Sequence, residues 1–147
     1  MPEESLERLY SPRILALAAD IPHAGRLEAP AGSARRRSPT CGSSVTVDLV
    51  VTDGRVSAFA QNVKACALGQ ASASVLGAGV LGLDRDAIAA GRAALEAMLK
   101  EDGPTPPPPF EGLEVLRPAQ SYRSRHNSIL LAWDATLEAF DAATAEG

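Results

Sequence analysis

The chain has 147 residues, of which 46% are hydrophobic and 22% charged, and its formal net charge is −4. This length and composition are typical of one compact globular domain. A net negative charge repels the phosphate backbone, so we expect neither DNA nor RNA as a partner. The N-terminus lacks the basic and apolar pattern of a signal peptide, and no apolar run approaches the length of a membrane span. We therefore expect a cytoplasmic protein that does not enter a membrane.

The first part of the chain predicts a helix followed by an irregular crossing. Apolar residues recur at helical spacing over residues 3–20, and Pro12 interrupts them, which predicts an entry turn and then a helix of about three turns. Residues 21–39 are rich in Pro, Gly, Ala and Arg, with one short strand expected at residues 35–38. The arginine run Arg35 to Arg37 is typical of a charged edge strand, which discourages pairing with another sheet. A docking patch for an acidic partner is the alternative.

Residues 44–64 carry the clearest β-strand pattern. Apolar and polar residues alternate from Ser44 to Val51 with a period of two, which places Asp48 on the solvent face. Asp53-Gly54 follows, a dipeptide preferred in two-residue hairpin turns because both positions need a positive φ. The return strand, Arg55 to Lys64, is expected to add three side chains to the apolar face of the first strand: Val56, Ala58 and Ala60.

Three helices are predicted after the hairpin. Residues 67–83 are almost all small or apolar, as in a buried helix that its neighbours approach closely. Residues 84–102 form a more amphipathic segment with Asp84 at the N-cap position, and a short turn is expected around residues 111–116. The last helix, residues 124–143, has an apolar face at helical spacing. This order of elements predicts an α+β fold in which helices pack on one face of a sheet of about three antiparallel strands.

The chain has two cysteines, Cys41 and Cys66, too few for a disulfide framework. Regular pairing across the hairpin turn would place them opposite each other, with their Cα atoms about 5 Å apart. Gly42 permits a close backbone approach beside Cys41, and Cys66 directly precedes a helix, whose N-terminus favours a negatively charged thiolate. We therefore predict two neighbouring thiols that can bind a metal or react with sulfur. A structural disulfide, or two buried small residues, are the alternatives.

His126 is a third candidate ligand, near the start of the last helix. It joins the thiols only if that helix begins beside the open end of the hairpin; otherwise it is a solvated residue. His23 is interpreted as a loop residue. Enzymatic activity is not predicted, because the chain lacks a phosphate-binding glycine motif and any supported nucleophile–base arrangement.

Three segments of the chain resemble the family of the NifU N-terminal domain, IscU and SufU. They are Pro39-Thr40-Cys41-Gly42, Cys66 with Ala71-Ser72-Ala73-Ser74, and His126-Asn127-Ser128-Ile129-Leu130. The resemblance runs from about Leu6 to Phe140 and implies a single domain, residues 1–147, with the NifU/IscU/SufE-like α+β fold. Members of the family assemble [2Fe–2S] clusters or bind zinc through three cysteines and an aspartate, sometimes with a histidine.

The resemblance assigns Cys41, Cys66 and His126 as metal or cluster ligands. Asn127 stands where the family has its third cysteine and Ser43 where it has its aspartate, so both are auxiliary candidates. Two thiolates and an imidazole can hold zinc with an open fourth position, but they form a weaker cage for a stable cluster. The implied cofactors are a [2Fe–2S] cluster or iron, with zinc as an alternative.

The implied function is that of an iron–sulfur cluster assembly protein, scaffold- or carrier-like, whose partners are a cysteine desulfurase and cluster-recipient proteins. Two alternatives remain open. One is a metal-free adaptor of the assembly machinery. The other is a sulfur acceptor, in which Cys66 takes persulfide sulfur from a desulfurase and Cys41 resolves it.

Overall fold

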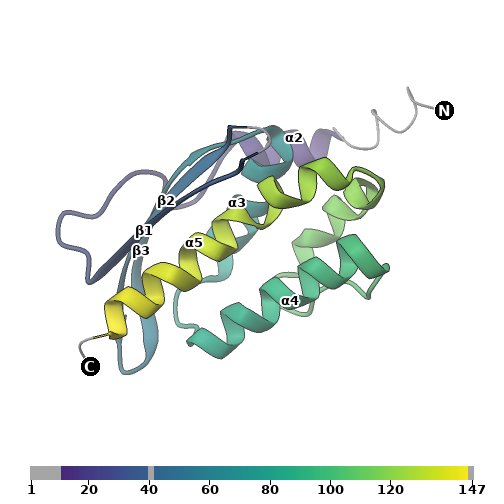
Figure 1. Cartoon of the computed structure of the whole chain (residues 1–147). Helices are drawn as coiled ribbons and strands as arrows, with labels where there is room; N and C mark the ends of the chain where they lie inside the picture. Colours follow the sequence, from purple (N-terminus) through teal and green to yellow (C-terminus); the bar gives the residue numbers. More distant parts are fainter. Residues whose placement is uncertain (1–10, 40–41, 146–147) are drawn as a thin grey trace.

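The computed structural model describes residues 11–39 and 42–145 (Figure 1). Its elements in chain order are α2 (Pro12–Ala19), β1 (Gly32–Arg37), β2 (Ser44–Thr52), β3 (Arg55–Lys64), α3 (Ala67–Gly79), α4 (Arg85–Glu101), the 3-10 helices η1 (Glu111–Ser121) and η2 (Arg123–Arg125), and α5 (His126–Thr144). None of the helices in the described ranges has the length and hydropathy that a membrane span requires.

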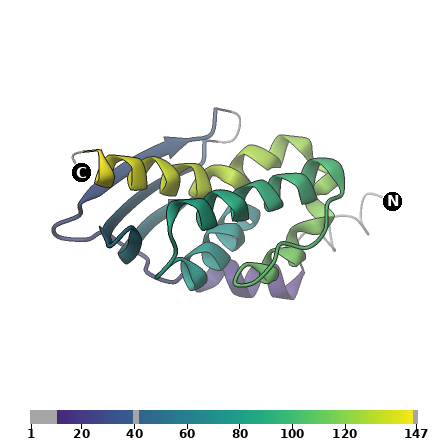
Figure 2. The same cartoon turned by 90° about the horizontal axis from the view of Figure 1, so that it is seen from below.

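The predicted α+β architecture is confirmed. The strands form one antiparallel sheet in the order β1-β2-β3, and α5 runs along one face of it. Seen from below, α3, α4 and α5 gather on that same side (Figure 2). The buried apolar side chains between sheet and helices form one continuous cluster, which includes the fully buried Trp133.

Ser11 and Pro12 determine where helix α2 starts. The Ser11 hydroxyl accepts a hydrogen bond from the Ile14 backbone N–H at 3.3 Å, and Pro12 occupies the first turn, where its missing N–H costs nothing. The helix has 8 residues, shorter than predicted. The part of the prediction that precedes residue 11 lies outside the described residues.

Strand β1 forms one edge of the sheet, as its arginines predict, although it starts at Gly32 rather than Arg35. Arg36 faces α5 and its guanidinium lies 3.0 Å from the Glu138 carboxylate. Gly32 faces the same helix, and a Cβ there would lie 2.1 Å from a backbone oxygen of α5. The early start of β1 therefore follows from the close approach of α5, which local composition does not reveal.

The hairpin between β2 and β3 turns at Asp53-Gly54, both with positive φ, as predicted. Val51 pairs with Val56 in the expected register, but a bulge between Val50 and Val51 displaces every later pair by one residue. The last pair is Ser44 with Lys64. The strands therefore depart by one residue from the regular register that would set Cys66 directly opposite Cys41. Cys41 lies outside the described residues, so the proximity of the two thiols remains a prediction.

The same bulge changes which side chains of β3 face the helices. Because Leu49 pairs with Phe59 and Val47 with Gln61, these β3 residues share the core face. Ala58 and Ala60 lie on the opposite face, contrary to prediction, while Val56 remains buried.

Asp48 is buried, not on a solvent face as predicted. Its carboxylate accepts two hydrogen bonds from the Arg26 guanidinium, at 2.6 and 3.1 Å, one from the Ser33 hydroxyl at 2.6 Å and one from the Leu27 N–H at 3.1 Å. The hydrogen bond from Arg26 is the largest influence on the pKa of Asp48 and lowers it, against the opposing effect of burial. The ion pair between Arg26 and Asp48 holds the irregular segment that precedes β1 against the sheet face opposite to the helices.

The helices follow their predicted patterns with shifted ends. Helix α3 is buried almost all round but stops at Gly79 rather than at residue 83. The Asp84 carboxylate caps α4 by accepting from the Ala87 N–H at 2.8 Å, as predicted. Instead of a short turn, η1 continues to Ser121, and α5 begins at His126.

Candidate functional site

Three segments that are distant in sequence meet at the open end of the hairpin. They are the residue before β2, the residue before α3 and the first turn of α5. The Ser128 hydroxyl lies 3.1 Å from the Ser43 hydroxyl and 3.6 Å from the Cys66 sulfur. Ser43 and Ser128 are buried, and Cys66 is half-buried. Ser128 therefore links α5 to the start of β2 and to the start of α3.

Small residues of α3 permit this meeting. At Gly69, a Cβ would lie 2.7 Å from the Ser128 hydroxyl and 3.0 Å from its carbonyl oxygen, so a larger residue would force the helices apart. One turn later the Ser72 hydroxyl donates to the Ile129 carbonyl at 2.7 Å and accepts from the Trp133 indole N–H at 3.0 Å. The small-residue segment after Cys66 is thus the surface on which α5 packs.

Cys66 occupies the N-cap position of α3. The Cys66 side chain makes no capping hydrogen bond to the helix, and the first turn of α3 contains no acidic residue. The sulfur therefore lies at the positive end of the α3 dipole, with no carboxylate in the first turn to compete for a cation or an electrophile. The environment suits a thiol that binds a cation or acts as a nucleophile.

The other predicted thiol, Cys41, lies outside the described residues. On either side of it, the Ser38 N–H donates to the Ser43 carbonyl at 2.8 Å and closes the connection between β1 and β2. Ser43, the auxiliary candidate, belongs to this closure and contacts Ser128.

His126 is buried rather than solvated. Its Nε2 lies 3.0 Å from the Ala119 carbonyl oxygen. Because a carbonyl can only accept, Nε2 carries the hydrogen in this contact, and Nδ1 is the ring nitrogen left for another partner. A histidine ligand is commonly oriented in this way, with one ring nitrogen donating to a backbone carbonyl while the other faces the metal.

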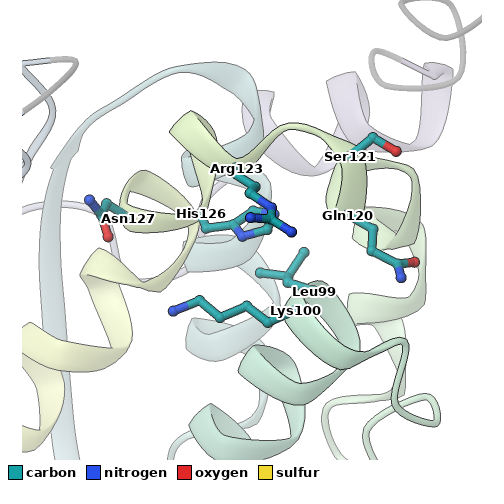
Figure 3. A pocket seen from close by; sticks show the side chains of 7 residues that line it. All are labelled: Leu99, Lys100, Gln120, Ser121, Arg123, His126 and Asn127. Carbon is teal, nitrogen blue, oxygen red and sulfur yellow. The ribbon is translucent and has the colours of Figure 1, made fainter.

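The start of α5 does lie beside the open end of the hairpin, as the hypothesis for His126 requires, because Ser128 contacts Ser43 there. Residues two apart on a helix nevertheless project about 200° apart. His126 accordingly lies in a hollow with Arg123, above Leu99 and Lys100, while Asn127 is exposed and points away from them (Figure 3).

The structure thus groups Ser43 and Cys66 around Ser128 and places His126 on the α4 side of α5. Within residues 11–39 and 42–145, no three His, Cys, Asp or Glu side chains are placed to hold one metal ion. The predicted ligand set includes Cys41 and so remains a prediction. Sequence reasoning missed Ser128 and Gly69; the only signal for Gly69 is its place one helical turn after Cys66.

These features define a class: small α+β proteins in which a hairpin, a small-residue helix and a C-terminal helix meet around a cysteine. The structure is similar to that of the N-terminal part of a nitrogen-fixing NifU-like protein from Brucella abortus, with a TM-score of 0.93, 40% sequence identity and coverage of 97% of this chain and 99% of that one. The chain belongs to the NifU-like family, which includes the IscU and SufU proteins.

Two other solved structures share the fold at lower identity. One is a proposed iron–sulfur cluster assembly scaffold protein for the SUF system from the thermophile Fervidobacterium islandicum AW-1, with a TM-score of 0.82, 18% identity and coverage of 91% of this chain and 98% of that one. The other is a hypothetical protein with a TM-score of 0.72, 20% identity and coverage of 92% and 98%. No protein-family model and no curated protein matches the sequence.

Proposed function

We propose that this protein is a scaffold or carrier in iron–sulfur cluster assembly, which holds iron, zinc or a transient [2Fe–2S] cluster as its cargo. Membership of the NifU-like family and likeness to a proposed SUF scaffold support the general role. The observation that carries the proposal is the half-buried Cys66 thiol at the N-terminus of α3, which contacts the same Ser128 hydroxyl as Ser43 does. Ser43 follows Cys41 by two positions in the sequence.

The ligands proposed are the thiolates of Cys41 and Cys66 and the imidazole of His126. Thiolate and imidazole donors select zinc and iron–sulfur clusters over hard cations such as magnesium. Ser43 and Asn127 would supply only weak neutral oxygen or nitrogen atoms. A metal ion or cluster held by only two strong anionic ligands keeps open coordination positions. Such a site suits a cargo that the protein receives from one partner and transfers to another.

The two thiols are the primary ligands in this proposal. His126 projects from the opposite side of α5 to Ser128, so the contribution of the imidazole depends on movement of the first helical turn. We expect its removal to weaken metal retention less than removal of either thiol.

The proposal places the protein in the cytoplasm, with a cysteine desulfurase as sulfur donor and cluster-recipient proteins as later partners. It assigns no catalytic residue and no nucleic-acid partner, consistent with a net charge of −4.

The exposure of Cys66 favours a second candidate function, sulfur acceptance. In that reaction the Cys66 thiolate attacks the outer sulfur of a desulfurase persulfide. A new S–S bond forms at Cys66, the donor S–S bond breaks, and the desulfurase cysteine leaves as its thiolate.

Anaerobic reconstitution with iron and sulfide tests the main proposal. We expect visible charge-transfer absorbance from the wild-type protein, its loss in Cys66→Ser and Cys41→Ser, and a smaller decrease in His126→Ala. His23→Ala is the matched control and should behave as wild type. A protein that gains no absorbance and contains no zinc would contradict the scaffold and favour a metal-free adaptor.

Mass spectrometry separates the second candidate function from the first. After incubation with a desulfurase and cysteine, an acceptor gains about 32 Da on Cys66 for each sulfur taken up. If Cys66 gains no mass, it does not accept sulfur.

A further inference from the structure

A hollow on the α4 side of α5 contains two basic side chains that the proposed function does not use. It lies between the last turn of α4, the end of η1, and the start of α5, and its volume is about 700 Å³ (Figure 3). Buried Leu99 and His126 lie among its lining residues, and exposed Lys100, Arg123 and Asn127 also line it. We call it the Arg123 cavity.

The charges of the Arg123 cavity are all of one sign. Lys100 and Arg123 line it, and no carboxylate from the described part of the chain does, although the chain as a whole carries a net charge of −4. The Lys100 ammonium donates to Glu96 at 3.0 Å, one helical turn away. The Arg123 side chain has no hydrogen-bond or ion-pair partner among the described residues, so its five N–H donors are available to a ligand.

The backbone adds to this positive potential. Helix α5 has 19 residues, no acidic residue in its first turn and no side-chain cap, and it begins at His126, which lines the cavity. The His126 N–H already donates to the Arg123 carbonyl, so the dipole of this helix N-terminus, rather than that N–H group, favours an anion here. The Gln120 amide supplies a further hydrogen-bond donor on the lining.

We propose that the Arg123 cavity binds a small organic or inorganic anion that carries two or more carboxylate or phosphate charges. The planar guanidinium of Arg123 matches the paired oxygens of either group, and Lys100 supplies a second positive charge. The cavity volume falls within the range of about 300 to 1,000 Å³ that small-molecule sites occupy. This binding needs no metal and stands apart from the thiol site.

Calorimetric titration of the metal-free protein at low ionic strength tests this inference, with citrate and pyrophosphate as probes and glycerol as the neutral control. We expect both anions to bind, and added salt to weaken them. Arg123→Gln and Lys100→Gln should each weaken binding at least tenfold, because each variant loses one charge-assisted hydrogen bond to the anion. The tighter of the two probes identifies the preferred oxyanion.

Arg35→Gln is the matched control, because it removes one exposed arginine charge on β1, away from the cavity. We expect the same affinity as in the wild type. Equal weakening by Arg35→Gln and Arg123→Gln, or no binding of either anion, would overturn the inference. Amide NMR shifts that cluster away from Lys100, Arg123 and Asn127 would also overturn it.

Discussion

The Ser128 hydroxyl and the Cys66 sulfur lie 3.6 Å apart, although 62 residues separate them in the chain. Ser128 also contacts Ser43, so one small hydroxyl links the first turn of α5 to both sides of the hairpin's open end. This contact is the structural basis for assigning the site.

Ser128→Ala should lower the free energy of unfolding by about 1 kcal/mol, because it removes a buried hydroxyl that bonds across the site. It should also reduce the iron retained after reconstitution, since Cys66 loses the contact that orients its side chain. Urea denaturation and iron analysis check the two effects. Ser57→Ala, at an exposed hydroxyl of β3, is the control; an equal loss of iron in both variants would contradict a role for Ser128 at the site.

Gly69→Ala should destabilise the protein by up to about 2 kcal/mol. Alanine gains roughly 1 kcal/mol of helix propensity over glycine, but its Cβ would lie 2.7 Å from the Ser128 hydroxyl, and overpacking of this kind costs about 1 to 3 kcal/mol or more. Thermal unfolding measures the difference. At Gly112 the nearest atom to a new Cβ would be Val75 at 3.4 Å, so Gly112→Ala should be nearly neutral. A stabilised Gly69→Ala protein would show that α3 and α5 are less tightly packed.

Asp48→Asn should lower the free energy of unfolding near neutral pH by about 2 kcal/mol, because the Arg26 guanidinium loses a charged acceptor. Arg26 lowers the pKa of Asp48 below its ordinary value of 3.8, so the unfolded chain binds a proton more readily than the folded one. The stabilisation is complete above that value and disappears as the pH falls through the lower, folded-state pKa.

Urea unfolding at a series of pH values measures this effect. The wild type should lose stability below about pH 4, and Asp48→Asn should lose less over the same interval. Asp53→Asn, at the exposed hairpin turn, should keep the wild-type profile. Parallel profiles for the wild type and Asp48→Asn would show that the ion pair does not contribute to acid sensitivity.

Asn127→Cys should tighten metal retention, because it adds a thiolate at the exposed position that directly precedes Ser128. Competition with a chelator measures the change. Ser121→Cys, on η1, adds an exposed thiol away from α5 and should leave retention as in the wild type. Weaker retention in Asn127→Cys would show that the resemblance misaligns the start of α5.

Local patterns in the sequence predicted those parts of the fold that depend on neighbours in the chain. Asp53-Gly54 identified the hairpin turn because the dipeptide itself favours positive φ, and Asp84 identified the start of α4 because an N-cap bonds within one turn. The bulge at Val50 could not be predicted in this way. The partner of Asp48 could not be either, because Arg26 is 22 residues away.

For the candidate site as well, the sequence predicted features that depend on nearby residues and missed those that depend on distant ones. The positions of the thiols around the hairpin and the small residues after Cys66 pointed to the region where β2, α3 and α5 meet. Ser128 was not recognised, because a buried serine in a helix becomes informative only when its partners are known. The burial of His126 depends on η1, whose Ala119 carbonyl lies seven residues earlier.

Cobalt(II) titration of the reduced protein under anaerobic conditions tests the central claim most directly, because thiolate–cobalt charge-transfer absorbance reports the number of sulfur ligands on one ion. Two thiolates on one ion predict a band that falls by about half in Cys41→Ser and in Cys66→Ser, and that disappears in the double variant. An intensity that stays at the wild-type level in either single variant would show that the two cysteines do not share a metal.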